Sequence, residues 1–497
     1  MALAGLDIGT SGCKFTILDE QSNVLGKDYC PYEAKREGGH HELDCEEVWN
    51  SVKRVIKNAT AQCPEEKVEA FAVTTLGETV ALLDKDDHII GGGIIYTDSR
   101  GQEECLELVR LMGGEKRMTE ITGTVPRSMY TLCKLMWMEK HSDIVDRADK
   151  ILLMEDFATY LFTGERKVAY SSAMRTLGLD VNTMTWSREV MDAAGIDYRK
   201  FSTPVPAGTI VGTVKPALAQ ELGLSPDTVV CTGGHDQACC ALGAGVVEDY
   251  VCMEGTGTTQ NNTFYSRDLL PMDFMIQHYF SFVPHALPDA HLYFWGIGAG
   301  GVLLQWFRDN LGRMEKQIAK EQGKDVYQML DAMVSPEPTG LLITPFFADT
   351  GAMEGPGQKA SFWGLSLETK PIDIYKGLME GLAFEIRHFY DILESGGIEI
   401  RHVHASGGGA KSPVWLQIKA DVTGRNFQAL KNSETGTVAC VMLASVALGK
   451  HKDLKDAAKT YVKLSRTYEP DPKRHTIYNE LYEKYKRISG AVDWIMK

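Results

Sequence analysis

An aspartate stands where an apolar run of this 497-residue chain gives way to a helix-like segment. Val229–Thr232 is typical of a strand, two glycines and His235 follow, and Asp236 precedes the helix-like segment Ala238–Leu242. A carboxylate at a strand-to-helix junction can take the proton from a bound hydroxyl, as catalytic groups of α/β folds often do. The competing interpretations are that Asp236 is only an N-cap, or that His235 is the base. We expect Asp236 to be ionised at neutral pH, since a helix N-terminus favours negative charge.

Four glycine-rich turns follow apolar stretches and could hold an anion; they are Gly9–Gly12, Gly255–Gly257, Gly296–Gly301 and Gly407–Gly409. Glycine lets the backbone approach a ligand closely, and successive N–H groups then form an anion cradle. Neither the P-loop pattern nor the Gly-x-Gly-x-x-Gly pattern after the first strand is present, which argues against those two kinds of nucleotide site. Each turn alone is weak evidence, because turns are rich in glycine for structural reasons.

The segment Met253–Gln260 repeats the pattern of Leu6–Lys14. In both, an apolar strand runs into Gly-Thr and a second turn of small residues, and extended chain follows. Two such hairpins facing each other could clamp one anion, although two Gly-Thr turns can also be alike by chance. We therefore predict two related domains, residues 1–245 and 246–497, with the boundary near Gly245.

The elements that position these turns are predicted to be alternating strands and helices, which indicates an α/β class. Leu3–Ile8 and the apolar runs that begin at Phe15 and Val24 predict a β-meander. Asp44 is a predicted N-cap of the helix that follows. Val68–Asp84, rich in β-branched residues, predicts a pair of strands.

The last glycine-rich turn lies between a predicted strand and a predicted helix. Val403–Ser406 is the strand, Ser412 and Pro413 are typical of a helix start, and Gly424 is typical of a helix end. Bare backbone at such a turn can lie against a flat group, and the helix N-terminus favours a nearby phosphate. We interpret this turn as an adenosine pocket, with a tight structural connection as the alternative.

Composition limits the classes of partner. The formal net charge of -15 makes nucleic acid an unsuitable partner, and it requires any ATP site to provide its own positive potential. No run of about 18 apolar residues and no signal peptide is visible, so we expect a cytoplasmic protein without a membrane partner. The eleven cysteines include no CxxC pair, which predicts reduced thiols rather than disulfides or zinc. The oligomeric state stays open, with a homodimer as one option.

Together these motifs resemble the FGGY carbohydrate kinases, a branch of the actin-like ATPase superfamily, over nearly the whole chain. Leu6–Lys14 looks like the first phosphate hairpin of that family, and Met129–His141 fits its first signature closely. Ser361–Leu365 with Asp373–Glu380 resembles the second signature, although Gly377 stands where Ala or Ser is usual. The resemblance implies two ribonuclease H-like domains with a cleft between them. It also implies transfer of phosphate from ATP to a hydroxyl of a small sugar or polyol.

The resemblance also implies roles for single residues. Asp236 would be the general base, and Asp7 would orient Mg²⁺. The residues implied to bind ATP are Thr10, Ser11, Lys14, Thr256, Gly301, Gln305, Gly408 and Gly409.

The substrate is less sharply defined by sequence. Gly77 and Glu78 occupy a stretch where xylulokinases typically carry Met-His and glycerol kinases carry Arg-Glu. Gln237 is similar to glycerol kinases, whereas Met129 stands about where their substrate tyrosine would be. We assign hydroxyl recognition to Glu78, Asp98 and Gln237, because carboxylates and amides suit that task. A ketose such as a pentulose is favoured, a glycerol- or tetritol-type polyol is the alternative, and a catalytically weak sugar-sensing protein is the alternative from another class.

Overall fold

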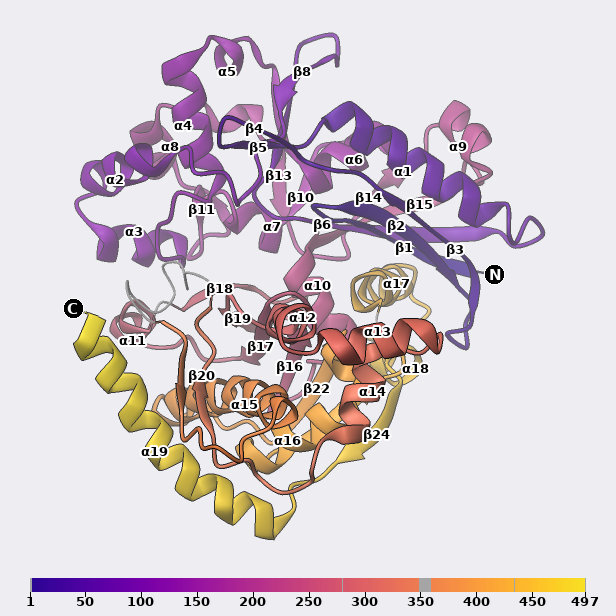
Figure 1. Cartoon of the computed structure of the whole chain (residues 1–497). Helices are drawn as coiled ribbons and strands as arrows, with labels where there is room; N and C mark the ends of the chain where they lie inside the picture. The colour runs from indigo at the N-terminus through magenta and orange to yellow at the C-terminus, as the bar shows by residue number, and fades with distance from the viewer. Residues whose placement is uncertain (1, 279, 348–358, 433, 497) are drawn as a thin grey trace.

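The computed structural model describes residues 2–278, 280–347, 359–432 and 434–496 (Figure 1). The chain forms an N-terminal lobe, β1 to β15, and a C-terminal lobe, β16 to α19, which lie one above the other in Figure 1. Each lobe is built around a mixed sheet that helices cover, which confirms the α/β prediction.

The N-terminal sheet has six strands in the order β14-β15-β6-β1-β2-β3. The predicted meander is its antiparallel half, and these strands are β1 Ala2–Ile8, β2 Gly12–Leu18 and β3 Val24–Pro31. β6 (Val68–Thr75) runs parallel to β1, and β15 (Val229–His235) runs parallel to β6. The carboxyl ends of these three parallel strands therefore meet at one edge of the sheet, where α/β folds place their ligands.

The predicted strand pair within Val68–Asp84 is corrected by the structure. β6 and β7 (Val80–Leu83) are both strands, but β7 lies in another sheet, between β8 (Ile89–Gly92) and β9 (Lys150–Leu153). Nearly all residues of both strands are buried, and the chain crosses from one sheet to the other between them. Such a run of apolar residues predicts a strand but not its partner.

The C-terminal sheet has seven strands in the order β18-β19-β17-β16-β22-β23-β24. β16 (Val251–Thr256) pairs antiparallel with β17 (Gln260–Ser266) and parallel with β22 (His402–Gly407). β1 has the same relation to β2 and β6, so the internal repeat seen in the sequence is confirmed as a structural repeat. The exact boundary near Gly245 stays a prediction.

Helices cover these sheets. Asp44 caps α1 (Cys45–Thr60) by accepting the N–H groups of Glu46 and Glu47, as the sequence predicts. The other helices are α2 Gln102–Leu111, α3 Glu115–Thr122, α4 Thr131–His141, α5 Ile144–Arg147, α6 Met154–Thr163, α7 Tyr170–Met174, α8 Arg188–Ala194, α9 Pro216–Leu222, α10 Asp236–Gly243, α11 Met272–Gln277, α12 Gly301–Asn310, α13 Arg313–Glu321, α14 Val326–Met333, α15 Pro371–Ser395, α16 Pro413–Thr423, α17 Thr435–Ala447, α18 Leu454–Tyr461 and α19 Pro472–Met496.

Short strands complete the two lobes. They are β4 Lys35–Glu37, β5 His40–Glu42, β10 Lys167–Ala169, β11 Leu179–Asp180, β12 Thr185–Trp186, β13 Thr203–Val205, β14 Ile210–Thr213, β18 Ser281–Pro284, β19 His291–Ile297, β20 Leu342–Thr344, β21 Ser361–Trp363, β23 Asn426–Leu430 and β24 Leu464–Tyr468.

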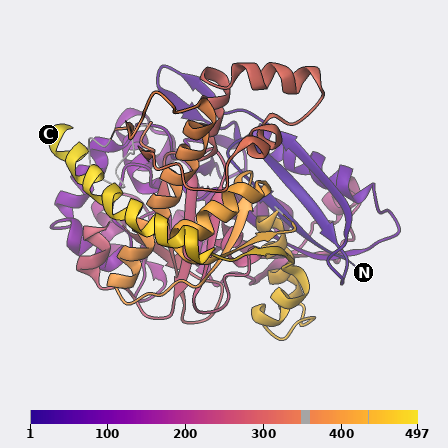
Figure 2. The ribbon, with the colours of Figure 1, turned by 60° about the horizontal axis from the view of Figure 1, so that its bottom comes forward.

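One helix of the C-terminal lobe packs on the N-terminal sheet. α17 contacts β1, β6 and α10, and nearly all of its residues are buried. The approach is close, since a Cβ on Gly5 of β1 would lie 2.3 Å from the Thr437 carbonyl oxygen. α10 and α17 therefore form the contact that ties the two lobes together. α19 instead runs along the outside of the C-terminal lobe (Figure 2).

The expectations about cysteines and about membrane spans can be compared with the structure. All eleven cysteines are free thiols, and nine of them are buried. None of the helices in the described parts of the chain combines the length and the apolar character that a membrane span requires.

Candidate active site

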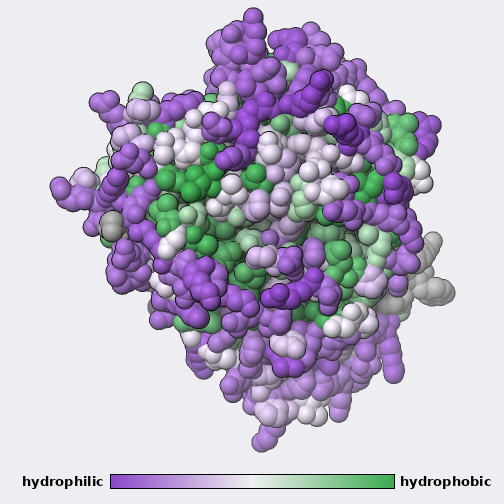
Figure 3. Space-filling view, turned by 180° about the vertical axis from the view of Figure 1, so that it is seen from behind, coloured by the Kyte–Doolittle hydropathy of each residue, from purple (hydrophilic) through white to green (hydrophobic). Residues whose placement is uncertain are grey.

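A cavity of about 370 Å³ lies beside Asp236 and is lined by both lobes. The N-terminal lobe contributes residues 76–78, 96, 127, 129–130, 175 and 235–237, and the C-terminal lobe contributes residues 259, 261, 263, 294 and 296–298. Viewed from the side opposite to Figure 1, apolar surface gathers across the middle of the molecule, where the lobes meet (Figure 3). The cavity therefore lies between the two lobes.

Asp236 is the first residue of α10 and follows the last residue of β15. Its side chain is 31% exposed, and its Oδ1 accepts the N–H of Gln237 at 2.6 Å. Burial and the carboxylates of Asp7 and Glu78 raise the pKa of Asp236 to about 7 against the opposing effects of the Gln237 N–H and of Arg175. The expectation of a fully ionised base is thus corrected, because burial outweighs the helix N-terminus.

His235 is buried, and its Nε2 lies 3.2 Å from Asp236 Oδ1. Burial, aided by the nearby positive charge of Arg175, lowers the pKa of His235 well below its usual value. A neutral imidazole at this distance lies against the carboxylate without adding charge to it. This geometry favours Asp236 over His235 as the base.

Glu78 lies in the cavity wall as predicted, and the structure supplies a partner that the sequence did not reveal. Arg175 Nε donates to Glu78 Oε1 at 2.6 Å, and Nη2 of the same guanidinium donates to the same oxygen. The guanidinium stacks on the ring of Tyr130 at 4.8 Å. Gln237 also lines the cavity, so Glu78 and Gln237 lie together beside Asp236. Arg175 and Tyr130 were missed because their partners are distant in the sequence.

The prediction for Asp98 is wrong. Its side chain is fully buried and does not line the cavity. The carboxylate accepts Arg100 Nε at 2.9 Å, Arg100 Nη2 at 2.6 Å and the N–H of His41 at 2.6 Å. Although burial raises the pKa of Asp98, these bonds outweigh burial and lower it to about 2. Asp98 therefore fixes the β5 region rather than a ligand.

The predicted first phosphate hairpin is the turn between β1 and β2. Two tyrosines of the β3 region brace it, since the Tyr29 hydroxyl donates to the Ser11 carbonyl and the Tyr32 hydroxyl donates to the Gly9 carbonyl. Thr10 and Ser11 line a second cavity of about 770 Å³, beside Tyr96, which also borders the first cavity. The two cavities therefore have Tyr96 in common.

Lys14 lies between two carboxylates. Its Nζ is 3.2 Å from Asp7 and 2.7 Å from Glu434, so its charge is already paired before a nucleotide binds. Arg36 and Lys35 of β4 line the cavity beside Thr10 and Ser11, and Lys35 is already 3.0 Å from Asp44. Of these two, Arg36 is the one without an ion-pair partner among the described residues, and it can add the local positive potential that an acidic ATP-binding protein requires.

Thr256 does not present its hydroxyl to the cleft, which corrects the role predicted for that side chain. It is fully buried, donates to Glu254 and accepts from Lys419 Nζ at 2.9 Å. The ammonium group of Lys419 is also 2.8 Å from Glu254. The exposed part of the second hairpin is its tip, residues 257–259, and any phosphate contact of the hairpin must come from there.

The remaining predicted nucleotide residues gather around this second tip. The N–H of Gly301 donates to the Gly257 carbonyl at 2.8 Å, which sets the start of α12 against the tip, and Gln305 is exposed on the same helix. Gly409 packs on Thr256, since a Cβ at Gly409 would lie 2.6 Å from Thr256 Cβ, and Gly408 beside it is exposed. The fold thus assembles these segments as a nucleotide pocket would require.

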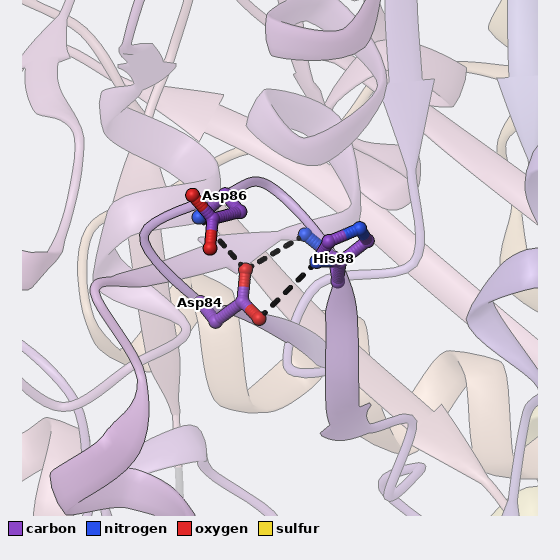
Figure 4. Close-up of side chains that lie close together, drawn as sticks. All are labelled: Asp84, Asp86 and His88. Carbon is purple, nitrogen blue, oxygen red and sulfur yellow. Dashed lines mark hydrogen bonds and ion pairs between the residues drawn. The ribbon is translucent and has the colours of Figure 1, made fainter.

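Asp7 fits the predicted role toward Mg²⁺. Its side chain is 12% exposed and offers hard oxygen donors, and burial raises its pKa, opposed mainly by Lys14. A second group of possible ligands, Asp84, Asp86 and His88, lies in the exposed turn between β7 and β8 (Figure 4). Asp84 there accepts the N–H groups of both neighbours, so the cluster shapes the turn and lies outside both cavities.

Comparison with known proteins places both halves of the chain in the same family. Residues 2–243 match the N-terminal domain of the FGGY family of carbohydrate kinases, and residues 255–448 match its C-terminal domain. The xylulose kinase of Staphylococcus epidermidis is 28% identical, covering 97% of this chain and 95% of that protein. The autoinducer-2 kinase of Yersinia enterocolitica is 27% identical, covering 98% and 94%.

Solved structures share the fold. The xylulose kinase of Rhodospirillum rubrum superposes with a TM-score of 0.89 at 23% identity, and the comparison covers 100% of both chains. A Plasmodium falciparum glycerol kinase with ADP gives a TM-score of 0.86 at 17% identity and covers 98% of each chain. At these identities the structures establish the fold of this chain.

Proposed function

Since this chain belongs to the FGGY family of carbohydrate kinases, we propose that it transfers the γ-phosphoryl group of ATP to a hydroxyl of a ketose such as a pentulose. The membership also confirms the predicted fold, two α/β domains of the actin-like ATPase type. The cytoplasm, which holds ATP, is the location that we propose. The choice of substrate rests on the xylulose kinases among the relatives and on the polar side chains of Glu78 and Gln237 in the cavity beside Asp236.

In the proposed reaction Asp236 accepts the proton of the sugar hydroxyl while the oxygen attacks the γ-phosphorus. His235, held neutral, lies against the carboxylate, and Glu78 and Gln237 bind other hydroxyls. The two hairpin turns hold the phosphates from opposite lobes. Asp7 would hold Mg²⁺, which would neutralise phosphate charge.

The observation that carries this proposal is one cavity that joins Asp236 to the hydroxyl-binding groups of Glu78 and Gln237. Because both lobes line it, closure would exclude water, and a kinase needs that to avoid hydrolysing ATP. Gln237 also supports a glycerol- or tetritol-type polyol as the second candidate substrate.

The test is a coupled ADP-release assay with Mg-ATP across pentuloses, hexuloses, aldonates, tetritols and glycerol. We expect the highest kcat/KM with a pentulose and loss of activity when a chelator removes Mg²⁺. Preference for a tetritol or glycerol would support the second candidate. Sugar binding without turnover of any compound would overturn the kinase proposal in favour of a sensor.

A further inference from the structure

A buried ion pair forms one wall of the substrate cavity. Glu78 and Arg175 are 4% and 10% exposed, and the Nε and Nη2 groups of Arg175 both donate to Glu78 Oε1. Among the described residues none is bonded to Glu78 Oε2. One carboxylate oxygen is thus used for the pair, and the other is left to accept a hydrogen bond from a ligand.

The cation of the pair is fixed in place, although Arg175 also lines the cavity. One face of the Arg175 guanidinium lies over the Tyr130 ring at 4.8 Å, and Nη1 is 3.5 Å from the Tyr130 hydroxyl. The Glu78 backbone is held as well, because the Thr131 hydroxyl donates to its carbonyl at 2.6 Å. The wall therefore presents a fixed carboxylate acceptor beside a cation whose charge that carboxylate neutralises.

The other charged and titratable groups that line the cavity do not change this balance. Arg127 adds one guanidinium and Asp236 adds one carboxylate, while His235 is neutral and Tyr96 is a phenol. Carboxylates and guanidiniums are therefore equal in number around the cavity. A ligand carboxylate at the Glu78 wall would meet a like charge, and like charges brought together at an interface oppose binding.

We propose that the Glu78–Arg175 pair is a charge filter, which admits uncharged polyhydroxy substrates and rejects sugar acids. The inference rests on the proposed kinase function and narrows its substrate class. Rejection by an unfavourable group is a common source of specificity, beside attraction to the right ligand.

Glu78→Gln is the sharpest test, because it keeps the size of the side chain and one acceptor oxygen but removes the charge. Arg175 is then a buried cation without a counter-ion, and a ligand carboxylate is the partner it favours. We expect kcat/KM for an aldonate to rise, and the ketose-to-aldonate ratio of kcat/KM to fall at least about tenfold. The additional change Arg175→Met should abolish this gain.

The assay compares a pentulose and the five-carbon aldonate in the wild type, in Glu78→Gln, in Arg175→Met and in the double variant. Asp421→Asn is the matched control, since it breaks a partly buried ion pair with Arg474 in the C-terminal lobe, and it should leave the ratio unchanged. An unchanged ratio in Glu78→Gln, or the same gain in the double variant, overturns the filter.

Two further measurements test the filter if Glu78→Gln does not fold or if the wild type shows no kinase activity. If Glu78→Gln does not fold, Arg175→Met tests the filter alone, because the unbalanced Glu78 should reject the aldonate more strongly than the wild type does. A gain of aldonate use in Arg175→Met would overturn the proposal. If the wild type phosphorylates no sugar, the kinase proposal fails, and calorimetric binding of the same two compounds then tests the filter separately.

Discussion

Replacing Asp236 by Asn should separate catalysis from binding. The amide has the size of the carboxylate but cannot accept the hydroxyl proton, so we expect kcat to fall by about 10²–10⁴-fold. The walls that bind ATP and sugar are unchanged, so both compounds should still bind measurably. The assay is ADP release with saturating Mg-ATP, and Asp227→Asn, an exposed carboxylate beside Lys67, is the control that should keep full activity.

The pH dependence of the wild type follows from the raised pKa of Asp236, about 7. Only the ionised form can accept a proton. At pH 6 about a tenth of the carboxyl groups are ionised and at pH 8 about nine tenths, so kcat/KM should rise about tenfold between these values. The rise should be absent from the residual activity of Asp236→Asn.

The same raised pKa predicts that the ionised Asp236, which catalysis needs, lowers the stability of the fold. A carboxyl group whose pKa rises from 3.8 in the unfolded chain to about 7 in the folded one takes up a proton on folding, so it destabilises the fold increasingly as pH rises from about 4 to 7. At about 1.4 kcal/mol per pH unit, the effect reaches about 4 kcal/mol at most. Asp236→Asn should therefore raise Tm at pH 8 and have little effect on it at pH 4, as measured by thermal unfolding.

Near-normal turnover by Asp236→Asn would refute the assignment of the base. A flat pH profile of the wild type between pH 6 and 8 would refute the electrostatic reasoning, even if the variant were inactive. A Tm gain that is equal at both pH values would show that the benefit comes from packing and not from the buried charge.

Three other substitutions test particular parts of the structure. Gly77→Ala places a Cβ 2.6 Å from His235 and 2.8 Å from Arg175. In steady-state kinetics, KM for the sugar should therefore rise while KM for ATP stays unchanged. Equal changes in the two KM values would contradict this reasoning. Lys419→Met leaves a buried carboxylate without its cation and should lower the free energy of unfolding by about 3–5 kcal/mol in denaturant titration. A variant as stable as the wild type would show that this pair is dispensable. Asp98→Asn should lower Tm but keep the substrate profile, and a changed profile would return Asp98 to the site.

Local pattern was sufficient for much of the fold. In each hairpin an apolar strand, a Gly-Thr turn and a second extended segment follow one another directly in the sequence. The hairpins of β1–β2 and β16–β17 could therefore be predicted from a few residues. Asp236 was found for the same reason, since a strand end and a helix start are both local signals. The pairing of β7 was not predicted, because a buried strand carries no information on which sheet it joins.

The sequence by itself thus determined the class of fold, the two Gly-Thr hairpin turns and the place of Asp236 at a strand-to-helix junction. Only the tertiary structure decided which charges are free to act. Glu78 and Asp98 are equal candidates in sequence, but Asp98 is taken by Arg100, two residues away, while Glu78 meets Arg175 from a distant segment and lines the cavity. The raised pKa of Asp236 has the same origin, because burial and the charge of remote neighbours depend on how the whole chain packs.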